Sequence, residues 1–300
     1  MLKTSRFVFV LLFIFGFIAT LMGNEWADYY FPDAVGSYWT YEDQDGEELT
    51  RYAIEPEDIE GETYRAFSYD PALEDWSDYK YHVHFYFYQV SDDWVAFFTG
   101  AEIENALEAV VTERLEGEFL QPLKEQVDSA VPPGVTFEMS TTFDAEAQDY
   151  FYLFPTPVTF NEEWVAMKVQ AEFIIRIDMA GDPNEIPPGG ALIFTFHIDI
   201  LETGTVEGTE TVETPAGTFE DCLKIEFQTE MQMTLEMFPP VEDAQLMLPD
   251  NSQVSTTLWL APNVGIIKMA KESEDNNTVK TLELTDYEII STESGSDETN

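Results

Sequence analysis

The sequence predicts a mainly β protein: a curved antiparallel sheet or half-open β-barrel, with a helical insertion packed against it. The clearest sign is the segment 223–237, where apolar and polar side chains take opposite parities. This alternation is typical of an antiparallel strand with one buried and one solvated face. A second sign is the number of other strand-like runs. The third is a single segment of helical periodicity, at about residues 101–130.

Residues 1–23 have the three parts of a secretory signal peptide. A short head with two basic residues is followed by an almost unbroken apolar run from Phe7 to Leu21, and Gly23 precedes Asn24 at the expected cleavage site. The apolar run is shorter than the roughly 20 residues of a membrane-spanning helix, which favours cleavage over anchoring. We therefore expect a periplasmic or extracellular protein whose mature chain has no transmembrane segment.

The sequence is strongly acidic, with 59 acidic and 13 basic residues and a formal net charge of −46. Such a charge disfavours nucleic acid and anionic membrane surfaces as partners. We interpret it as a solvated surface, with a cation-binding surface or a docking face for a basic partner as alternatives. Hydrophobic residues make up 44% of the chain, which is enough for a core. Cys222 is the only cysteine, so we expect no internal disulfide.

Residues 24–290 are expected to form one β-rich domain, and the polar segment 291–300 a disordered tail. Asp45-Gly46 predicts a hairpin between the first two strands, because both residues tolerate positive φ. Before the helical insertion the predicted strands are 37–42, 47–54, 62–69, 79–90 and 94–98; after it they are 164–179, 191–206, 223–237, 255–261, 265–271 and 278–290.

The helical insertion is predicted from apolar residues that recur every three or four positions between Ala101 and Val127. We expect a break near Gly117 and a restart near Pro122. The segment Val131-Pro-Pro-Gly134 then ends the helix.

Three segments resemble a family of exported bacterial proteins, the TapB-like group. They are Phe31-Pro-Asp-Ala-Val-Gly-Ser-Tyr-Trp-Thr-Tyr41, Val212-Glu-Thr-Pro-Ala-Gly-Thr-Phe-Glu-Asp-Cys-Leu-Lys-Ile225 and Trp259-Leu-Ala-Pro-Asn-Val-Gly-Ile-Ile-Lys268. The resemblance implies a half-open antiparallel β-barrel similar to periplasmic lipoprotein carriers, and it brings no catalytic residue with it. The motifs also suggest a tight turn at Pro215-Ala-Gly217, with Phe219 folding back as an apolar plug.

Few residues suggest metal or nucleophile chemistry. His82 and His84 would share one face of a strand and could begin a zinc site, but no spacing indicates further ligands, and His197 stands alone. The run from Asp43 to Glu48 imitates the start of a calcium loop, although a hairpin turn explains it. Cys222 falls on the polar parity of its strand, without a base indicated nearby. We assign no catalytic residue, no metal ligand and no cofactor.

A group of methionines is the better indication of binding. Met231, Met233, Met237 and Met247 lie on or near the apolar parity of their segment. Methionines form adaptable apolar surfaces, although they also fill cores. Two hypotheses follow. The first is a non-catalytic exported protein that binds an apolar or lipid-like ligand, or another envelope protein, through residues that the sequence does not identify. The alternative is a hydrolase that uses acidic residues or a metal.

Overall fold

A computed structural model describes most of the chain. The described residues are 29–72, 83, 85–100, 103–105, 107–108, 120–130, 132, 134–182, 184–187, 189–240, 253–273 and 278–290. The expected signal peptide with its cleavage site at Gly23 and Asn24, the tail 291–300, and the pair His82 and His84 lie outside them.

The described chain forms one antiparallel sheet of thirteen strands. Their spatial order is β6-β8-β9-β10-β11-β12-β13-β1-β2-β3-β4-β5-β7. Their bounds are β1 Tyr38–Asp43, β2 Glu48–Ile59, β3 Glu62–Asp70, β4 Phe87–Val90, β5 Trp94–Phe98, β6 Thr136–Ala147, β7 Tyr150–Pro155, β8 Glu163–Ala180, β9 Ala191–Thr214, β10 Gly217–Phe238, β11 Gln253–Ala261, β12 Gly265–Ser273 and β13 Thr278–Glu288.

The sheet is curved but does not close into a barrel, because β6 and β7 remain as its two edges. These edge strands follow each other in the chain. Between them, the Gln148 N–H donates to Lys168 O at 3.1 Å, and Asp149 O accepts from the Thr99 N–H at 2.9 Å. The two edges therefore meet where the chain turns from β6 into β7, and the predicted half-open architecture is confirmed.

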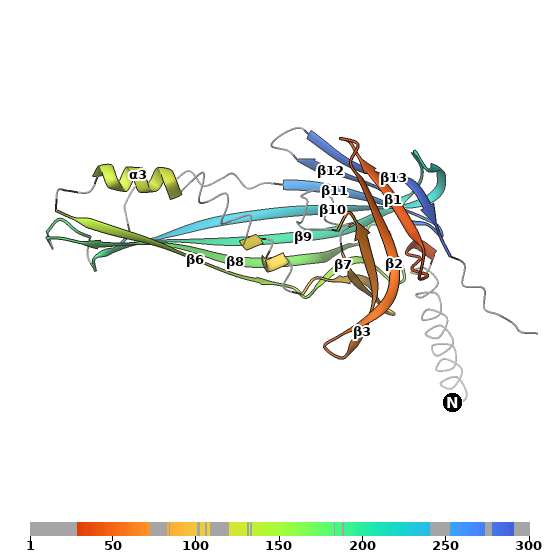
Figure 1. The fold of residues 1–300 in the computed structure, drawn as a ribbon, viewed down its shortest axis with the longest axis horizontal. Coiled ribbons are helices and arrows are strands. Elements are labelled where there is room, and N and C mark those ends of the chain that lie inside the picture. The colour runs from red at the N-terminus through yellow and green to blue at the C-terminus, as the bar shows by residue number, and fades with distance from the viewer. Residues whose placement is uncertain are drawn as a thin grey trace, which may run out of the picture.

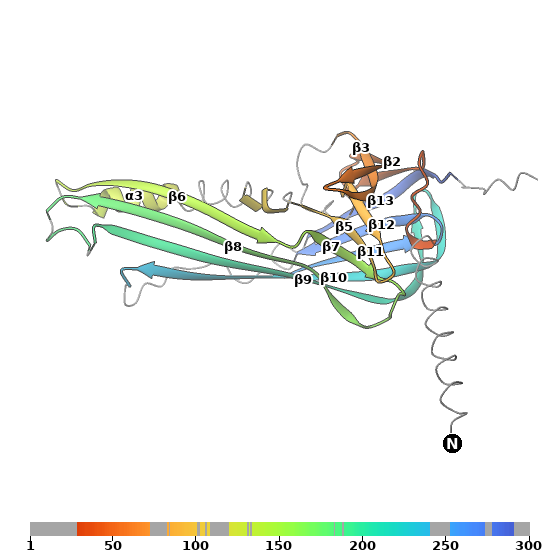
Figure 2. The same ribbon diagram turned by 90° about the horizontal axis from the view of Figure 1, so that it is seen from below.

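Strand length divides the molecule into two regions (Figures 1 and 2). We call the first the body; it holds β1–β5, β7, β11–β13 and the adjoining halves of β8, β9 and β10. We call the second the arm; it consists of β6 with residues 169–180, 191–200 and 231–238, which extend beyond the body. The helix α3, Gln121–Ala130, lies along the arm.

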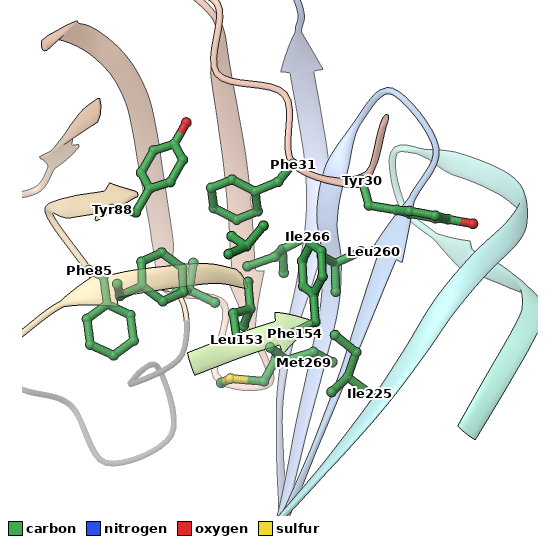
Figure 3. Close-up of a cluster of buried hydrophobic side chains, with 14 of the residues drawn as sticks. Tyr30, Phe31, Phe85, Tyr88, Leu153, Phe154, Ile225, Leu260, Ile266 and Met269 are labelled. Atoms are coloured by element: carbon green, nitrogen blue, oxygen red, sulfur yellow. The ribbon is translucent and has the colours of Figure 1, made fainter. Parts of the chain in front are cut away.

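The body is filled by its own side chains. Figure 3 shows Leu153 from β7 and Ile225 from β10 pointing into one cluster, together with Phe85 from the segment before β4 and Phe31 from the segment before β1. The aromatic residues of β1 also bond across the interior. Trp39 Nε1 donates to Val264 O, and Tyr41 Oη donates to Ile266 O at 2.8 Å. These bonds tie the first strand to the turn before β12 and to β12 itself.

One charged side chain lies inside this apolar cluster. Arg51 on β2 is 1% exposed, and neither its Nε nor its Nη1 has a hydrogen-bond partner. Its guanidinium carbon lies 4.4 Å from the ring centre of Phe67 and 4.5 Å from that of Trp39. The face of an aromatic ring attracts a cation, so the rings of Phe67 and Trp39 lie beside the guanidinium where a carboxylate would otherwise balance its charge.

The described strands agree with most of the predicted ones, including the hairpin at Asp45-Gly46, where Gly46 has φ +82°. Two differences stand out. The strand predicted over 79–90 is a strand only from Phe87 onward among the described residues. Strands β6 and β7 were not predicted at all. Within the predicted insertion, α3 begins one residue before Pro122, which is acceptable because proline fits the first turn of a helix.

Candidate functional site

The arm carries an apolar face built from alternate residues of its four strands. Strand pairing places Phe173 opposite Phe196, and Phe196 opposite Leu235, so the same side of every strand is apolar. The five most buried members are Phe173, Ile175, Ile177, Phe194 and Phe196; around them lie the half-buried side chains of Phe137, Met139, Phe143, Met179, Leu192, Met233, Leu235 and Met237.

Methionine is prominent on this face, as the sequence predicted. Met231, Met233 and Met237 are half-buried members of β10 and lie on the same side of the strand as Leu235. Met247 lies outside the described residues. Because a thioether side chain is flexible and polarisable, such a surface can adapt to ligands of different shape.

The helix α3 covers part of the face. Leu123 and Val127, one turn apart, pack against the buried cluster of the arm, as does Leu120 just before the helix. Side chains three and four positions apart lie on one side of a helix, so this contact uses the apolar stripe that predicted the helix. The prediction that the insertion packs against the sheet is confirmed for α3.

Between α3 and β6 the cover is incomplete and leaves a groove of about 820 Å³. Its apolar surface comes from Leu120, Val135, Phe137 and Met139. The remaining lining residues are Lys124, Asp128, Pro132, Gly134, Thr136, Glu138 and Thr141. The groove therefore joins an apolar floor to a polar rim, a combination that suits a molecule with one apolar part and one polar part.

The opposite face of the arm is polar and holds a smaller hollow of about 370 Å³. Here His197 Nδ1 lies 3.5 Å from Glu172 Oε2, and Asp144, Glu146 and Asp199 also line the hollow. Among the described residues no group of three or more His, Cys, Asp or Glu side chains could hold a metal ion.

Among the residues that the structure describes, three carboxyl groups have shifted pKa values, and all three shifts are downward. A hydrogen bond from Arg176 lowers the pKa of Asp178, bonds from Asn184 lower that of Asp182, and a bond from Lys224 lowers that of Glu207. A general acid needs a raised pKa in order to hold its proton near neutral pH. These groups therefore give the hydrolase alternative no support.

Cys222 is fully buried, so its predicted position on the polar side of β10 is wrong. The reason is that the pairing of β9 with β10 is irregular on both sides of Cys222, with register shifts between Phe219 and Cys222 and between Lys224 and Ile225, so the alternation of the following residues does not extend back to Cys222. The thiol donates to Phe219 O at 3.3 Å, and burial raises its pKa to about 11. A protonated, buried thiol is a poor nucleophile.

The two turn motifs have structural roles. Asp43 Oδ1 accepts the N–H groups of Asp45 and Glu47, so the calcium-like run is a hairpin turn fastened by its first carboxylate. Residues 215–216 form the turn between β9 and β10, as predicted. Phe219 is only half-buried and lies 6.0 Å from the ring of Tyr287, so it borders the core instead of plugging it.

Comparison with known proteins gives one family match. A model described as DUF3108-like matches residues 193–284, less than half of the chain. The match spans two of the segments that suggested the TapB-like group, but it does not confirm that name. No curated protein matches the sequence.

Two solved structures are similar in shape. One is a protein of Bacteroides fragilis inferred to be exported and described as having a YmcC-like fold; it is 14% identical, has a TM-score of 0.39, and the match covers 87% of this chain and 99% of that one. The other is a protein of Parabacteroides distasonis inferred to be a lipoprotein; it is 13% identical, has a TM-score of 0.38, and the match covers 87% and 98%. Within the described residues, no helix has the length and apolarity needed to cross a membrane.

Proposed function

We propose that this protein is a non-catalytic exported protein that binds an apolar, lipid-like molecule in the groove between α3 and β6. Export rests on the signal-peptide pattern of residues 1–23, which places the mature chain in the periplasm or outside the cell. Binding rests on one observation. The apolar face of the arm is only partly covered, and the gap is a groove of about 820 Å³.

The groove suits such a ligand better than the body does. In the body the interior positions are taken by large rings such as Phe85, Phe97 and Phe151, which are at most 1% exposed. In the groove, Phe137 and Met139 are only partly buried. A ligand that buries them removes apolar surface from water, at about 25 cal/mol for each Å².

The test is native mass spectrometry of the mature protein purified without detergent, followed by extraction and identification of retained molecules. We expect an apolar molecule at one per chain. Replacing Phe137 with Ser should release it, because the floor of the groove loses its largest ring. The matched control is Ile174→Ser, which removes a half-buried aliphatic side chain from the opposite face of the arm.

The proposal fails if the protein retains no molecule and gains none when mixed with lipid extracts. It also fails if Ile174→Ser releases the ligand as readily as Phe137→Ser, because the effect would then come from a general loosening of the arm.

A further inference from the structure

The charges around the groove indicate which apolar molecules it accepts. Three ionisable side chains line it, Lys124, Asp128 and Glu138. Lys124 and Asp128 are four residues apart on α3 and hence lie on neighbouring turns of one side of the helix, where their charges offset each other. Glu138 lies on the opposite side of β6 from Phe137 and Met139 and adds a second negative charge at this edge of the sheet, so the charge around the groove is negative on balance.

The rest of the chain strengthens this negative potential. The net charge is −46, and several of the few basic groups are already bound to carboxylates. Arg65 pairs with Asp33, Arg176 with Asp178, Lys224 with Glu207 and Lys268 with Glu283. A cleft in a field of one sign concentrates ligands of the opposite sign and repels those of the same sign.

From these charges, and on the basis of the function proposed above, we infer that the groove selects amphiphiles with a positively charged head. The apolar tail lies on Phe137, Met139 and Leu120, and the head lies at the rim near Asp128 and Glu138. Fatty acids and other anionic amphiphiles are rejected, because the one basic side chain among the described lining residues, Lys124, lies one helical turn from Asp128.

The experiment is calorimetric titration of the mature protein with three probes of equal chain length, decylammonium, decanol and decanoate, each below its micelle concentration. At low salt we expect decylammonium to bind one site at least tenfold more tightly than decanoate, with decanol between them. In 1 M NaCl the Debye length falls to about 3 Å, so the preference should shrink while decanol binding persists.

Two variants of groove residues and one control variant test whether the effect comes from the groove. Asp128→Asn should reduce the preference for decylammonium severalfold, whereas Glu220→Gln, an equal change of charge at an exposed residue of β10 in the body, should not. Phe137→Ser should weaken all three probes at least tenfold.

The outcomes separate the two proposals. If none of the probes binds, the proposed function fails and the inference fails with it. If decanol binds but decanoate binds as tightly as decylammonium, only the inference on charge fails. If decylammonium binding is unchanged in Phe137→Ser, the cation is held elsewhere on the acidic surface, and the inference is again overturned.

Discussion

Trp164 on β8 lies against Gly204 on β9, and the indole fills the space that a side chain at position 204 would need. The two residues are paired across the strands. A Cβ atom at Gly204 would lie 2.4 Å from Trp164 Cζ2 and 3.0 Å from Phe227 Cε1. Because Gly204 has no side chain, the indole of Trp164 can occupy this place in the body.

Replacing Gly204 with Ala should destabilise the protein by about 1–3 kcal/mol, the usual cost of overpacking. Urea unfolding of the two single variants and the double variant checks this. In a Trp164→Leu background the same glycine change should cost clearly less, because the atoms that clash are gone. Equal costs in both backgrounds would show that the indole is not the obstacle.

Two tyrosines of β1 allow a matched test of burial. The Tyr41 hydroxyl donates to Ile266 O inside the body, whereas the Tyr38 hydroxyl donates to Asp286 at the surface, at 3.0 Å. Tyr41→Phe leaves a buried carbonyl without this donor and should cost about 1–3 kcal/mol. Tyr38→Phe should cost less than about 1 kcal/mol, because water replaces the lost partner. Thermal or urea unfolding measures both, and similar losses would contradict the expectation.

For Arg51 we expect a substitution to raise the free energy of unfolding. Burying a guanidinium without a hydrogen-bonded counter-ion costs several kcal/mol, and each neighbouring aromatic ring returns only about 0.5–2 kcal/mol. Arg51→Met keeps much of the side-chain volume and removes the charge. We expect the free energy of unfolding to rise by about 1 kcal/mol or more, measured by urea denaturation. A fall would show that the cation–π contacts with Trp39 and Phe67 outweigh the desolvation.

Stability should also fall at alkaline pH. Burial raises the pKa of the Cys222 thiol from 9.0 to about 11 and that of Tyr30 from 10.0 to about 12. Both neutral forms are thus favoured by folding. Their stabilisation is complete below the unfolded values and is lost as the pH rises through the folded ones, between about pH 9 and 12.

The measurement is the free energy of unfolding from pH 7 to 12. The double variant Cys222→Ala, Tyr30→Phe should lose less stability across that window than the wild type. Below pH 9 the two curves should run parallel. A double variant that follows the wild-type curve up to pH 12 would show that other groups, such as the buried Tyr41, account for the loss.

The sequence predicted strands best where side chains alternate cleanly. In the segment from Leu223 to Phe227 the odd-numbered residues are buried, as expected, because their side chains point into the interior of the body. The same rule failed at Cys222, where a bulge inserts residues that no pattern indicates. It missed β6 for a related reason: on that edge strand the apolar side is only half-buried, and it includes Thr141 and Ala145 among Phe137, Met139 and Phe143.

The candidate groove was harder to predict than the strands. The methionines of β10 indicated an adaptable apolar surface, but their neighbours Phe137 and Met139 come from a segment about 90 residues earlier in the chain. Only the register between β6, β8, β9 and β10 brings these side chains to one face. The burial of Arg51 depends in the same way on long-range packing. The one sign in the local sequence was that Arg51 alternates with the apolar residues Leu49 and Ala53, which places all three side chains on the same side of β2.

The pairing of β1 with β13 has a consequence for how the chain acquires its structure. Tyr38 is aligned with Glu288, so the first strand finds one of its two neighbours only at the end of the sequence. A chain delivered N-terminus first, from a ribosome or through a translocation channel, holds β1 with one edge open until nearly all of it has emerged. Trp39 and Tyr41 likewise cannot form their hydrogen bonds to Val264 O and Ile266 O until that part of the chain has been delivered. Because contacts so distant in sequence form slowly, the nascent protein presents an unfinished sheet edge for most of its delivery, and a chaperone that shields strand edges would act on it during that interval.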